Sequence, residues 1–212
     1  RGLGDVYKRQ TVDWYKFFSV TIPLIETEEG LSMVFEVRAA GLKTQPGDIC
    51  FPGGRMEEGE TALQCALREL KEETGISPSD LRVLGQFDTL HEFSGHTLYT
   101  FAVSLAPQAL QKARLNQEEV AELFTVPLKF FRENTAEIYD IDVVSDVSDF
   151  PYDKTGISPD YKWRKGKNLL PLYRYEDKII WGITARIVKW FIEQIMTCLL
   201  YTSPSPRDST SS

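Results

Sequence analysis

The chain has 212 residues, with 24 Lys and Arg side chains against 31 Asp and Glu side chains, and its formal net charge is −7. This acidic balance argues against a protein that coats nucleic acid, and the length leaves room for one full hydrophobic core. The sequence has no apolar run long enough to span a membrane and no recognisable secretory leader. Its three cysteines have no metal-binding spacing, and their odd number suits a reducing compartment. These features favour a cytoplasmic protein.

The two ends of the chain are interpreted separately from the rest. Residues 1–10, RGLGDVYKRQ, and residues 198–208, CLLYTSPSPRD, back-translate in different frames to the two strands of one inverted DNA element, which resembles a sequencing-library adapter. We therefore interpret 1–10 and 198–212 as adapter-derived tails and expect a single domain over residues 11–197. Leaving out the tails makes the net charge more negative still.

Two strand pairs are predicted in the first half of the chain. Residues 19–25 and 31–39 are rich in Val, Ile, Phe and Met and flank a Thr-Glu-Glu-Gly turn. Residues 81–90 and 96–105 form a second such pair around a Phe-Ser-Gly turn, and residues 121–126 read as a further strand that ends at a proline.

A helix over residues 61–74 carries signals at both ends. Thr61 and Gln64 form a capping-box pattern, and Gly75 suits the left-handed conformation that ends many helices. The sequence therefore predicts a helix between the two strand pairs.

The last third of the chain predicts a loop and a second helix. Residues 146–167 are polar and contain prolines and glycines, which indicates a long loop or lid. Residues 179–195 place apolar side chains at roughly helical spacing, and we expect this helix to pack on the sheet.

Three glutamates on one side of the first helix indicate a cation site. Glu69, Glu72 and Glu73 fall within an arc of about 100° on a helical wheel. Their repulsion would cost roughly 0.2–0.5 kcal/mol on a bare helix, and a divalent cation would reverse that sign. Oxygen-only ligands suit Mg²⁺, with Mn²⁺ able to replace it, and Arg68 lies one turn before Glu72, where it can hold that carboxylate. For three isolated glutamates, a solvated acidic helix face is the alternative.

The wider spacing is similar to that of a known motif. Five residues separate Gly54 from Glu60, seven more lead to Arg68, and the run that follows is Arg-Glu-Leu-Lys-Glu-Glu-Thr-Gly-Ile. This resembles the Nudix box, GX5EX7REUXEEXGU with U an aliphatic residue, at every defined position. The resemblance implies an α/β fold of the Nudix type, an α/β/α sandwich with a mixed central β-sheet, that hydrolyses a nucleoside diphosphate linked to another moiety.

The resemblance also implies roles for the residues of the box. Glu60 and Arg68 are expected to stabilise the loop and helix. The implied metal ligands are Glu69, Glu72, Glu73 and the carbonyl oxygen of Gly54.

In Nudix enzymes the general base is either a glutamate of the box or a carboxylate from a loop. We favour Glu72, and Glu118, Glu119 and Glu122 supply the alternative in this chain. Glu72, Arg68 and Glu119 are therefore the predicted catalytic residues.

A second motif, before the box, narrows the substrate. Residues 34–54 are similar to the coenzyme A pyrophosphatase signature, LLTXR(S/A)X3RX3GX3FPGG. Arg38 and the Phe-Pro-Gly-Gly run match, whereas Val-Phe-Glu replaces Leu-Leu-Thr and Lys43 replaces an arginine. The resemblance implies cleavage of coenzyme A or acyl-CoA to 3′,5′-ADP and 4′-phosphopantetheine or its acyl form. Arg38, Lys43 and Arg55 are the candidate substrate-binding residues, although lysine lacks the bidentate fork of arginine.

Two other functions stay open at this point. One is hydrolysis of another nucleoside diphosphate derivative, such as ADP-ribose or NADH, against which only the second motif argues. The other is a non-catalytic ligand-binding module, which has no physical need for clustered, self-repelling carboxylates. In each case we expect a small-molecule ligand and neither nucleic acid nor a membrane as a partner, and the sequence leaves room for a homodimer.

Overall fold

The computed structural model describes residues 16–92 and 94–202, which form two compact units with their boundary between Glu133 and Asn134. Residues 1–15 and 203–212 lie outside the described residues, and with them most of both predicted tails. The single domain expected over 11–197 stays a prediction.

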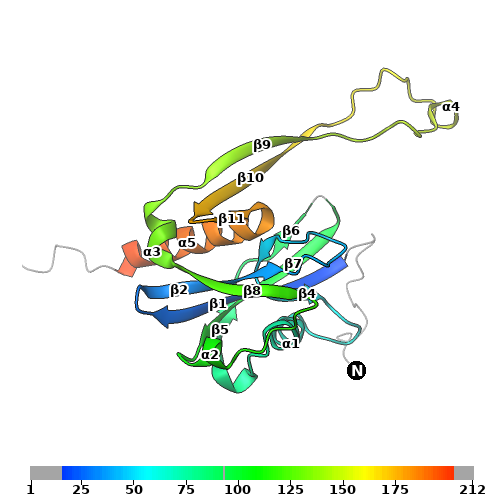
Figure 1. Cartoon of the computed structure of the whole chain (residues 1–212). Coiled ribbons are helices and arrows are strands. Elements are labelled where there is room, and N and C mark those ends of the chain that lie inside the picture. The colour runs from blue at the N-terminus through cyan, green and yellow to red at the C-terminus, as the bar shows by residue number, and fades with distance from the viewer. Residues whose placement is uncertain (1–15, 93, 203–212) are drawn as a thin grey trace, which may run out of the picture. The chain divides into compact units, whose positions relative to one another are not determined.

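The first unit is an α/β structure built on a mixed sheet (Figure 1). Its strands pair in the order β3-β2-β1-β7-β5, with β4 beside β1, β6 beside β7 and β8 beside β2. β1 runs parallel to β7, whereas its other partners are antiparallel. The strands are β1 (Lys16–Thr27), β2 (Gly30–Arg38), β3 (Ile49–Cys50), β4 (Gly53–Arg55), β5 (Leu81–Gln86), β6 (Leu90–His91), β7 (His96–Leu105) and β8 (Val120–Pro127). The helices are α1 (Ala62–Thr74), α2 (Ala109–Lys112) and α3 (Leu128–Glu133), with a 3-10 turn η1 (Pro78–Asp80).

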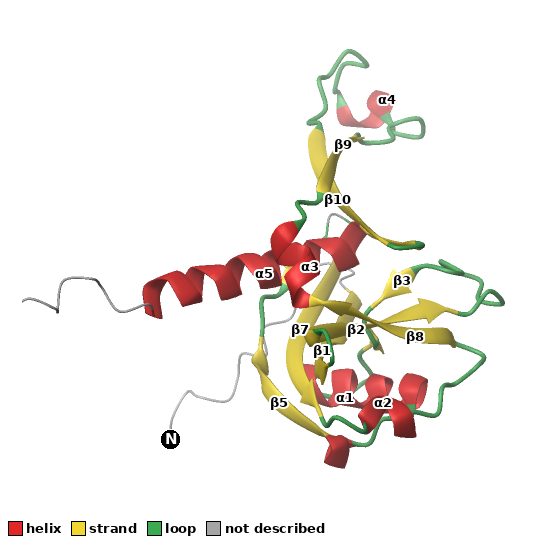
Figure 2. Ribbon diagram, turned by 60° about the vertical axis from the view of Figure 1, so that its left-hand side comes forward, coloured by secondary structure: helices red, strands yellow, loops and turns green. Residues whose placement is uncertain are grey.

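Within this unit, helices α1 and α3 pack on opposite faces of the sheet, as expected for the sandwich (Figures 1 and 2). Neighbouring residues of a strand point to opposite faces, and β2 shows the consequence. Val34 belongs to an apolar cluster with Ile76, which directly follows the cap of α1, whereas the ring of Phe35 lies 6.1 Å from that of Phe131 in α3. The predicted α/β fold with a mixed central sheet is therefore confirmed.

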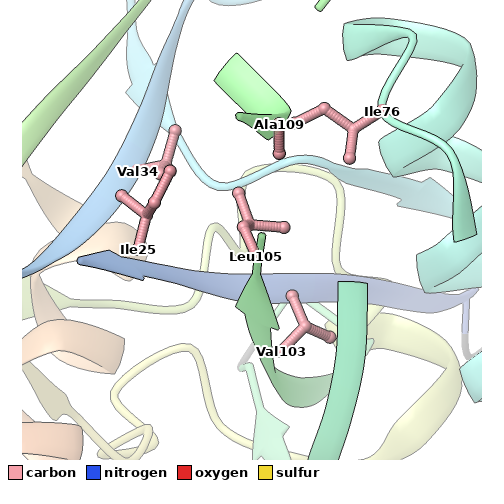
Figure 3. Close-up of a cluster of buried hydrophobic side chains, with 6 residues drawn as sticks. All are labelled: Ile25, Val34, Ile76, Val103, Leu105 and Ala109. Atoms are coloured by element: carbon pink, nitrogen blue, oxygen red, sulfur yellow. The ribbon is translucent and has the colours of Figure 1, made fainter. Parts of the chain in front are cut away.

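The core on the α1 side joins elements that are far apart in the sequence (Figure 3). Its members come from β1, β2, β7, α2 and the residue after the cap of α1, and each is at most 5% exposed. They are Ile25, Val34, Ile76, Val103, Leu105 and Ala109. This cluster anchors the end of α1 against the sheet.

Helix α1 confirms both predicted end signals. The Thr61 hydroxyl accepts a hydrogen bond from the Gln64 backbone N–H, and the Gln64 side chain accepts one from the Thr61 backbone N–H. Gly75 has φ +70° and its N–H donates to the Lys71 carbonyl. The helix is therefore fixed at both ends by local interactions.

The second predicted strand pair is present but shorter than expected. The strand predicted over 81–90 ends at Gln86 and resumes only as β6. The register between β5 and β7 shifts between Val83 and Gly85. The Asp88 carbonyl accepts a hydrogen bond from the Thr100 hydroxyl, whereas in a continuous strand it would accept one from a backbone N–H.

The second unit holds a three-stranded antiparallel sheet in the order β11-β10-β9, and helix α5 packs on β10 and β11. Its elements are β9 (Glu137–Val143), α4 (Tyr152–Thr155), β10 (Gly166–Tyr175), β11 (Lys178–Trp181) and α5 (Gly182–Thr202). The predicted long loop is irregular apart from the single turn of α4 and the first residues of β10. No helix among the described residues has the length and apolar character needed to cross a membrane.

The helix predicted over 179–195 was wrong at its start. Residues 179–181 lie in β11, where Ile179 and Ile180 pair with Arg174 and Tyr173 of β10. The β-branched side chains favour this pairing, and α5 begins only at Gly182, with φ +65°. The helix then continues to Thr202, into the segment interpreted as a tail.

Replacing Gly75 by alanine should destabilise the protein by more than about 1 kcal/mol. An alanine there would have to adopt a positive φ, and its Cβ would lie 2.7 Å from the Arg114 carbonyl oxygen. Gly59→Ala is the matched control, because Gly59 has φ +81° but open space around the added carbon. Urea unfolding should give a larger loss for Gly75→Ala, and equal losses would show that the contact with Arg114 does not matter.

Candidate active site

The predicted metal ligands come from two elements that pack on each other. Glu69, Glu72 and Glu73 lie on α1, and Gly54 lies in the short strand β4, which pairs with β1. Helix α1 packs on both β1 and β4. The structure therefore brings Glu69 and Glu73 of the box next to the glycines of β4, on the face of the sheet that α1 covers.

Two glycines allow the close approach of β4 to its neighbours. A Cβ on Gly53 would lie 2.4 Å from the Ser19 carbonyl oxygen of β1, and one on Gly54 would lie 2.4 Å from the carboxylate of Glu69. Glycine is thus required at Gly53, where an added carbon would meet backbone, whereas at Gly54 an added carbon would displace the Glu69 carboxylate.

Arg68 holds three carboxylates with one guanidinium. Its Nε and Nη2 atoms donate to the two oxygens of Glu60 at 2.9 and 3.1 Å, which is a bidentate pair. Nη1 donates to Glu69 at 2.8 Å and to Glu72 at 2.9 Å, and Nη2 also donates to the Arg55 carbonyl at 3.3 Å. The expected contact with Glu72 is therefore present, together with two more.

Glu73 is the buried member of the box. Its side chain accepts a hydrogen bond from the Gly53 backbone N–H at 2.9 Å, and the residue is 5% exposed. Burial raises the pKa of this carboxyl group, and the charge of Glu36 raises it further. Burial also raises the pKa of Glu69, which Arg68 partly offsets.

Glu36 of β2 is a residue of this site to which sequence reasoning gave no role. It is 1% exposed; its Oε1 atom accepts a hydrogen bond from the Cys50 thiol at 3.1 Å, and its Oε2 atom has no hydrogen-bond partner. Burial raises its pKa above the ordinary value. The available signal was one acidic residue in the apolar run Val-Phe-Glu-Val, where the signature has threonine.

The three candidate substrate-binding residues lie at different distances from the box. Arg38 ends β2, its Nη2 donates to the Thr44 carbonyl at 3.4 Å, and its buried Nε has no hydrogen-bond partner. Arg55 ends β4, is exposed, and touches Arg68 through its carbonyl. Lys43 is exposed in the loop between β2 and β3, and no hydrogen bond or ion pair of the described residues connects its side chain to the box.

Glu119, in the loop before β8, is linked to the box by its charge. Its charge raises the pKa of both Glu69 and Glu73. Its carboxylate accepts a hydrogen bond from the Asn116 amide at 3.0 Å, and its backbone carbonyl accepts one from Ala39 N–H. Glu122 pairs with Val37, the neighbour of Glu36, so it points to the opposite face of the sheet.

The donor types fit a hard divalent cation. The box offers carboxylate oxygens and one backbone carbonyl oxygen, the donors that Mg²⁺ and Mn²⁺ prefer. Within the described residues, no three acidic, histidine or cysteine side chains are already arranged to hold a metal ion, and Arg68 bonds to both Glu69 and Glu72. A cation would therefore compete with this guanidinium for the two carboxylates.

An open groove lies along the exposed side of α1. It has a volume of about 390 Å³ and is lined by Leu67, Arg68, Lys71, Glu72 and Pro78. Two of the predicted catalytic residues, Arg68 and Glu72, thus face a space that can admit part of a ligand.

Comparisons with known proteins identify the family of the chain. The NUDIX domain family matches residues 16–145. The chain is 37% identical over 115 residues to the mouse "Peroxisomal coenzyme A diphosphatase NUDT7", a match that covers 54% of this chain and 48% of the mouse protein. It is 31% identical over 183 residues to the "Uncharacterized Nudix hydrolase NudL" of Yersinia enterocolitica, covering 84% of this chain and 80% of that protein.

A solved structure is also similar, the C. elegans Ap4A hydrolase binary complex, with a TM-score of 0.46, 18% identity and coverage of 53% of this chain and 80% of that one. The chain spans about half the length of the mouse relative.

Without divalent cations, the protein should lose stability as the pH rises above about 4.5, the ordinary pKa of Glu73. Burial raises the pKa of this group in the folded state, so the folded state holds the proton more tightly than the unfolded state does. The contribution of protonated Glu73 to the free energy of unfolding is therefore fully present below pH 4.5. It is lost as the pH rises from 4.5 to the folded-state pKa. Urea midpoints in EDTA between pH 4.5 and 8 should fall less steeply for Glu73→Gln than for the wild type.

The amide oxygen that Glu73→Gln introduces can still accept the hydrogen bond from the Gly53 N–H, so this comparison isolates the charge. Glu28→Gln, in the exposed turn after β1, controls for the loss of one negative charge. Parallel curves for all three proteins would contradict the assignment.

Proposed function

Because the chain belongs to the NUDIX domain family, we propose that it is a pyrophosphohydrolase that cleaves the diphosphate bond of coenzyme A or acyl-CoA. The observation that carries the proposal is the packing of Glu69 and Glu73 of α1 against the glycines of β4, with Arg68 bonded to Glu69 and Glu72. The products would be 3′,5′-ADP and 4′-phosphopantetheine or its acyl form.

The choice of coenzyme A rests on two supports. The first is the match of Arg38, Ala39, Gly47 and the Phe-Pro-Gly-Gly run to the coenzyme A pyrophosphatase signature. The second is the similarity to a mouse protein named as a coenzyme A diphosphatase, which covers about half of each chain.

The proposed cofactor is Mg²⁺, with Mn²⁺ as a substitute, held by Glu69, Glu72, Glu73 and the carbonyl oxygen of Gly54. When bound, such an ion neutralises charge on the diphosphate and lowers the pKa of a bound water. Arg68 bonds to Glu69 and Glu72 in the structure and would share these two carboxylates with the ion. Glu60 keeps this guanidinium fixed through its bidentate pair.

The proposed general base, which takes the proton of the attacking water, is either Glu72 or Glu119. Glu72 lies at the groove with its side chain 54% exposed and bonded to Arg68. Glu119 is exposed and held by Asn116, and its field reaches Glu69 and Glu73. These properties support Glu119 over Glu118 and Glu122 as the loop candidate.

Arg38, Lys43 and Arg55 are proposed to bind the phosphates of the substrate. Arg38 has a buried Nε without a hydrogen-bond partner, so a phosphate oxygen would satisfy it. Lys43 is exposed in the loop between β2 and β3, and Arg55 is exposed at the end of β4. Cytoplasmic location, a homodimer and the absence of nucleic-acid and membrane partners stay predictions.

Incubation with Mg²⁺ should release 3′,5′-ADP from coenzyme A, and EDTA should abolish the reaction. Glu69→Gln should lower kcat at least about 100-fold, because a neutral amide is a poor ligand for a hard cation. Product analysis by chromatography, with dephospho-CoA, ADP-ribose and NADH in parallel and Glu28→Gln as the charge control, makes the measurement. Cleavage of ADP-ribose but not coenzyme A would refute the substrate assignment, and inactivity toward all four would favour a binding module.

Lys43→Arg should lower KM for coenzyme A several-fold and leave kcat nearly unchanged. The change restores the arginine of the signature and adds a bidentate contact to a phosphate, where lysine supplies only a point charge. Steady-state kinetics with coenzyme A gives the result, and Lys129→Arg, exposed on α3, is the matched control. An unchanged or higher KM in Lys43→Arg would remove Lys43 from the substrate-binding set.

A further inference from the structure

Glu36 is the most deeply buried acidic side chain of the described residues, at 1% exposure. Only one of its two carboxylate oxygens has a hydrogen-bond partner, the Cys50 thiol, which is a weak donor. Buried carboxylates in proteins are normally paired with a cation, a set of donors or a metal ion. The Oε2 atom of Glu36 therefore lacks the partner that such a group requires.

The side chain of Glu36 points to the α1 face of the sheet. Residues two apart on a strand share a face, so Glu36 faces the same side as Val34, which packs with Ile76 at the end of α1 (Figure 3). Phe35, between them, faces α3 instead. Glu36 thus lies on the side of the sheet that carries the box.

The groups around Glu36 are mostly carboxylates. Its charge is the largest electrostatic contribution that raises the pKa of Glu73, and the charges of Glu69 and Glu119 act on Glu36 in the same direction. Among the described residues, the charge of Arg38 lowers the pKa of Glu36. A second cation would be attracted to this position by four acidic groups.

Cys50 takes up one of the two carboxylate oxygens of Glu36 and leaves the other without a partner. Cys50 pairs directly with Glu36 across β2 and β3, and its thiol occupies Oε1. The chain then runs through Phe51 and Pro52 to Gly53, whose N–H binds Glu73. The same short segment therefore positions both buried carboxylates.

We propose that Glu36 is a further cation-binding residue of this site, which adds a buried carboxylate from β2 to the helix-borne set. This inference rests on the proposed function, because it assumes that the box binds a divalent cation. Sequence comparison with the signature would not find it, since the signature has threonine at this position.

Mn²⁺ binding tests the assignment without any substrate. Free Mn²⁺ is measured by electron paramagnetic resonance during titration of the wild type, Glu36→Gln and Glu28→Gln, and the Mn²⁺-dependent rise in Tm gives a second readout. Glu36→Gln should bind Mn²⁺ about tenfold more weakly or worse, with a smaller rise in Tm, and Glu28→Gln should behave as the wild type. The Tm in EDTA should not fall, because the change removes a buried charge and keeps the shape of the side chain.

Affinity within about twofold of the wild type in a folded Glu36→Gln would overturn the inference. Should Glu36→Gln not fold in EDTA, Glu36→Asp decides, because it keeps the charge but withdraws the carboxylate by one methylene; unchanged affinity in that variant overturns the inference equally. Failure of the proposed function looks different, since then the wild type binds no Mn²⁺ or Glu69→Gln binds it as tightly as the wild type.

Discussion

The site depends on one guanidinium that offsets the repulsion of a set of carboxylates. Arg68 bonds to Glu60, Glu69 and Glu72, which come from the loop before α1 and from two turns of the helix. Without a cation at this position, the like charges would favour separation of the loop from the helix and fraying of α1. The arrangement therefore keeps acidic groups of the loop and the helix close together.

The elements that sequence reasoning predicted well are those determined by neighbouring residues. Helix α1 is one, because Thr61, Gln64 and Gly75 set its ends through contacts within a few residues. The box followed from spacing alone, since a helix brings Glu69, Glu72 and Glu73 to one side whatever surrounds it. Glu36 was given no role because its burial depends on β3, β8 and α1, whose approach to β2 no local pattern encodes.

The second unit illustrates the other limit of sequence reasoning. Ile179 and Ile180 fit a helical spacing with Ile183 and Ile187, and nothing local separates the two groups except Gly182. Pairing with β10 decided the outcome, because the hydrogen bonds of a hairpin compete with those of a helix. Strands β9 and β10 were not predicted for the same reason: Glu137–Val143 carries Asp140 and Asp142, and becomes a strand only through its partner.

The contact between Gly54 and Glu69 makes these two positions epistatic. Any side chain at Gly54 would begin 2.4 Å from the Glu69 carboxylate, so it would displace that group as well as alter the backbone around the Gly54 carbonyl. Mutagenesis of Gly54 alone therefore cannot separate the contribution of its carbonyl oxygen from that of the glutamate. Evolutionary change is constrained in the same way, because a larger residue at position 54 is compatible only with a Glu69 side chain that has moved or been lost.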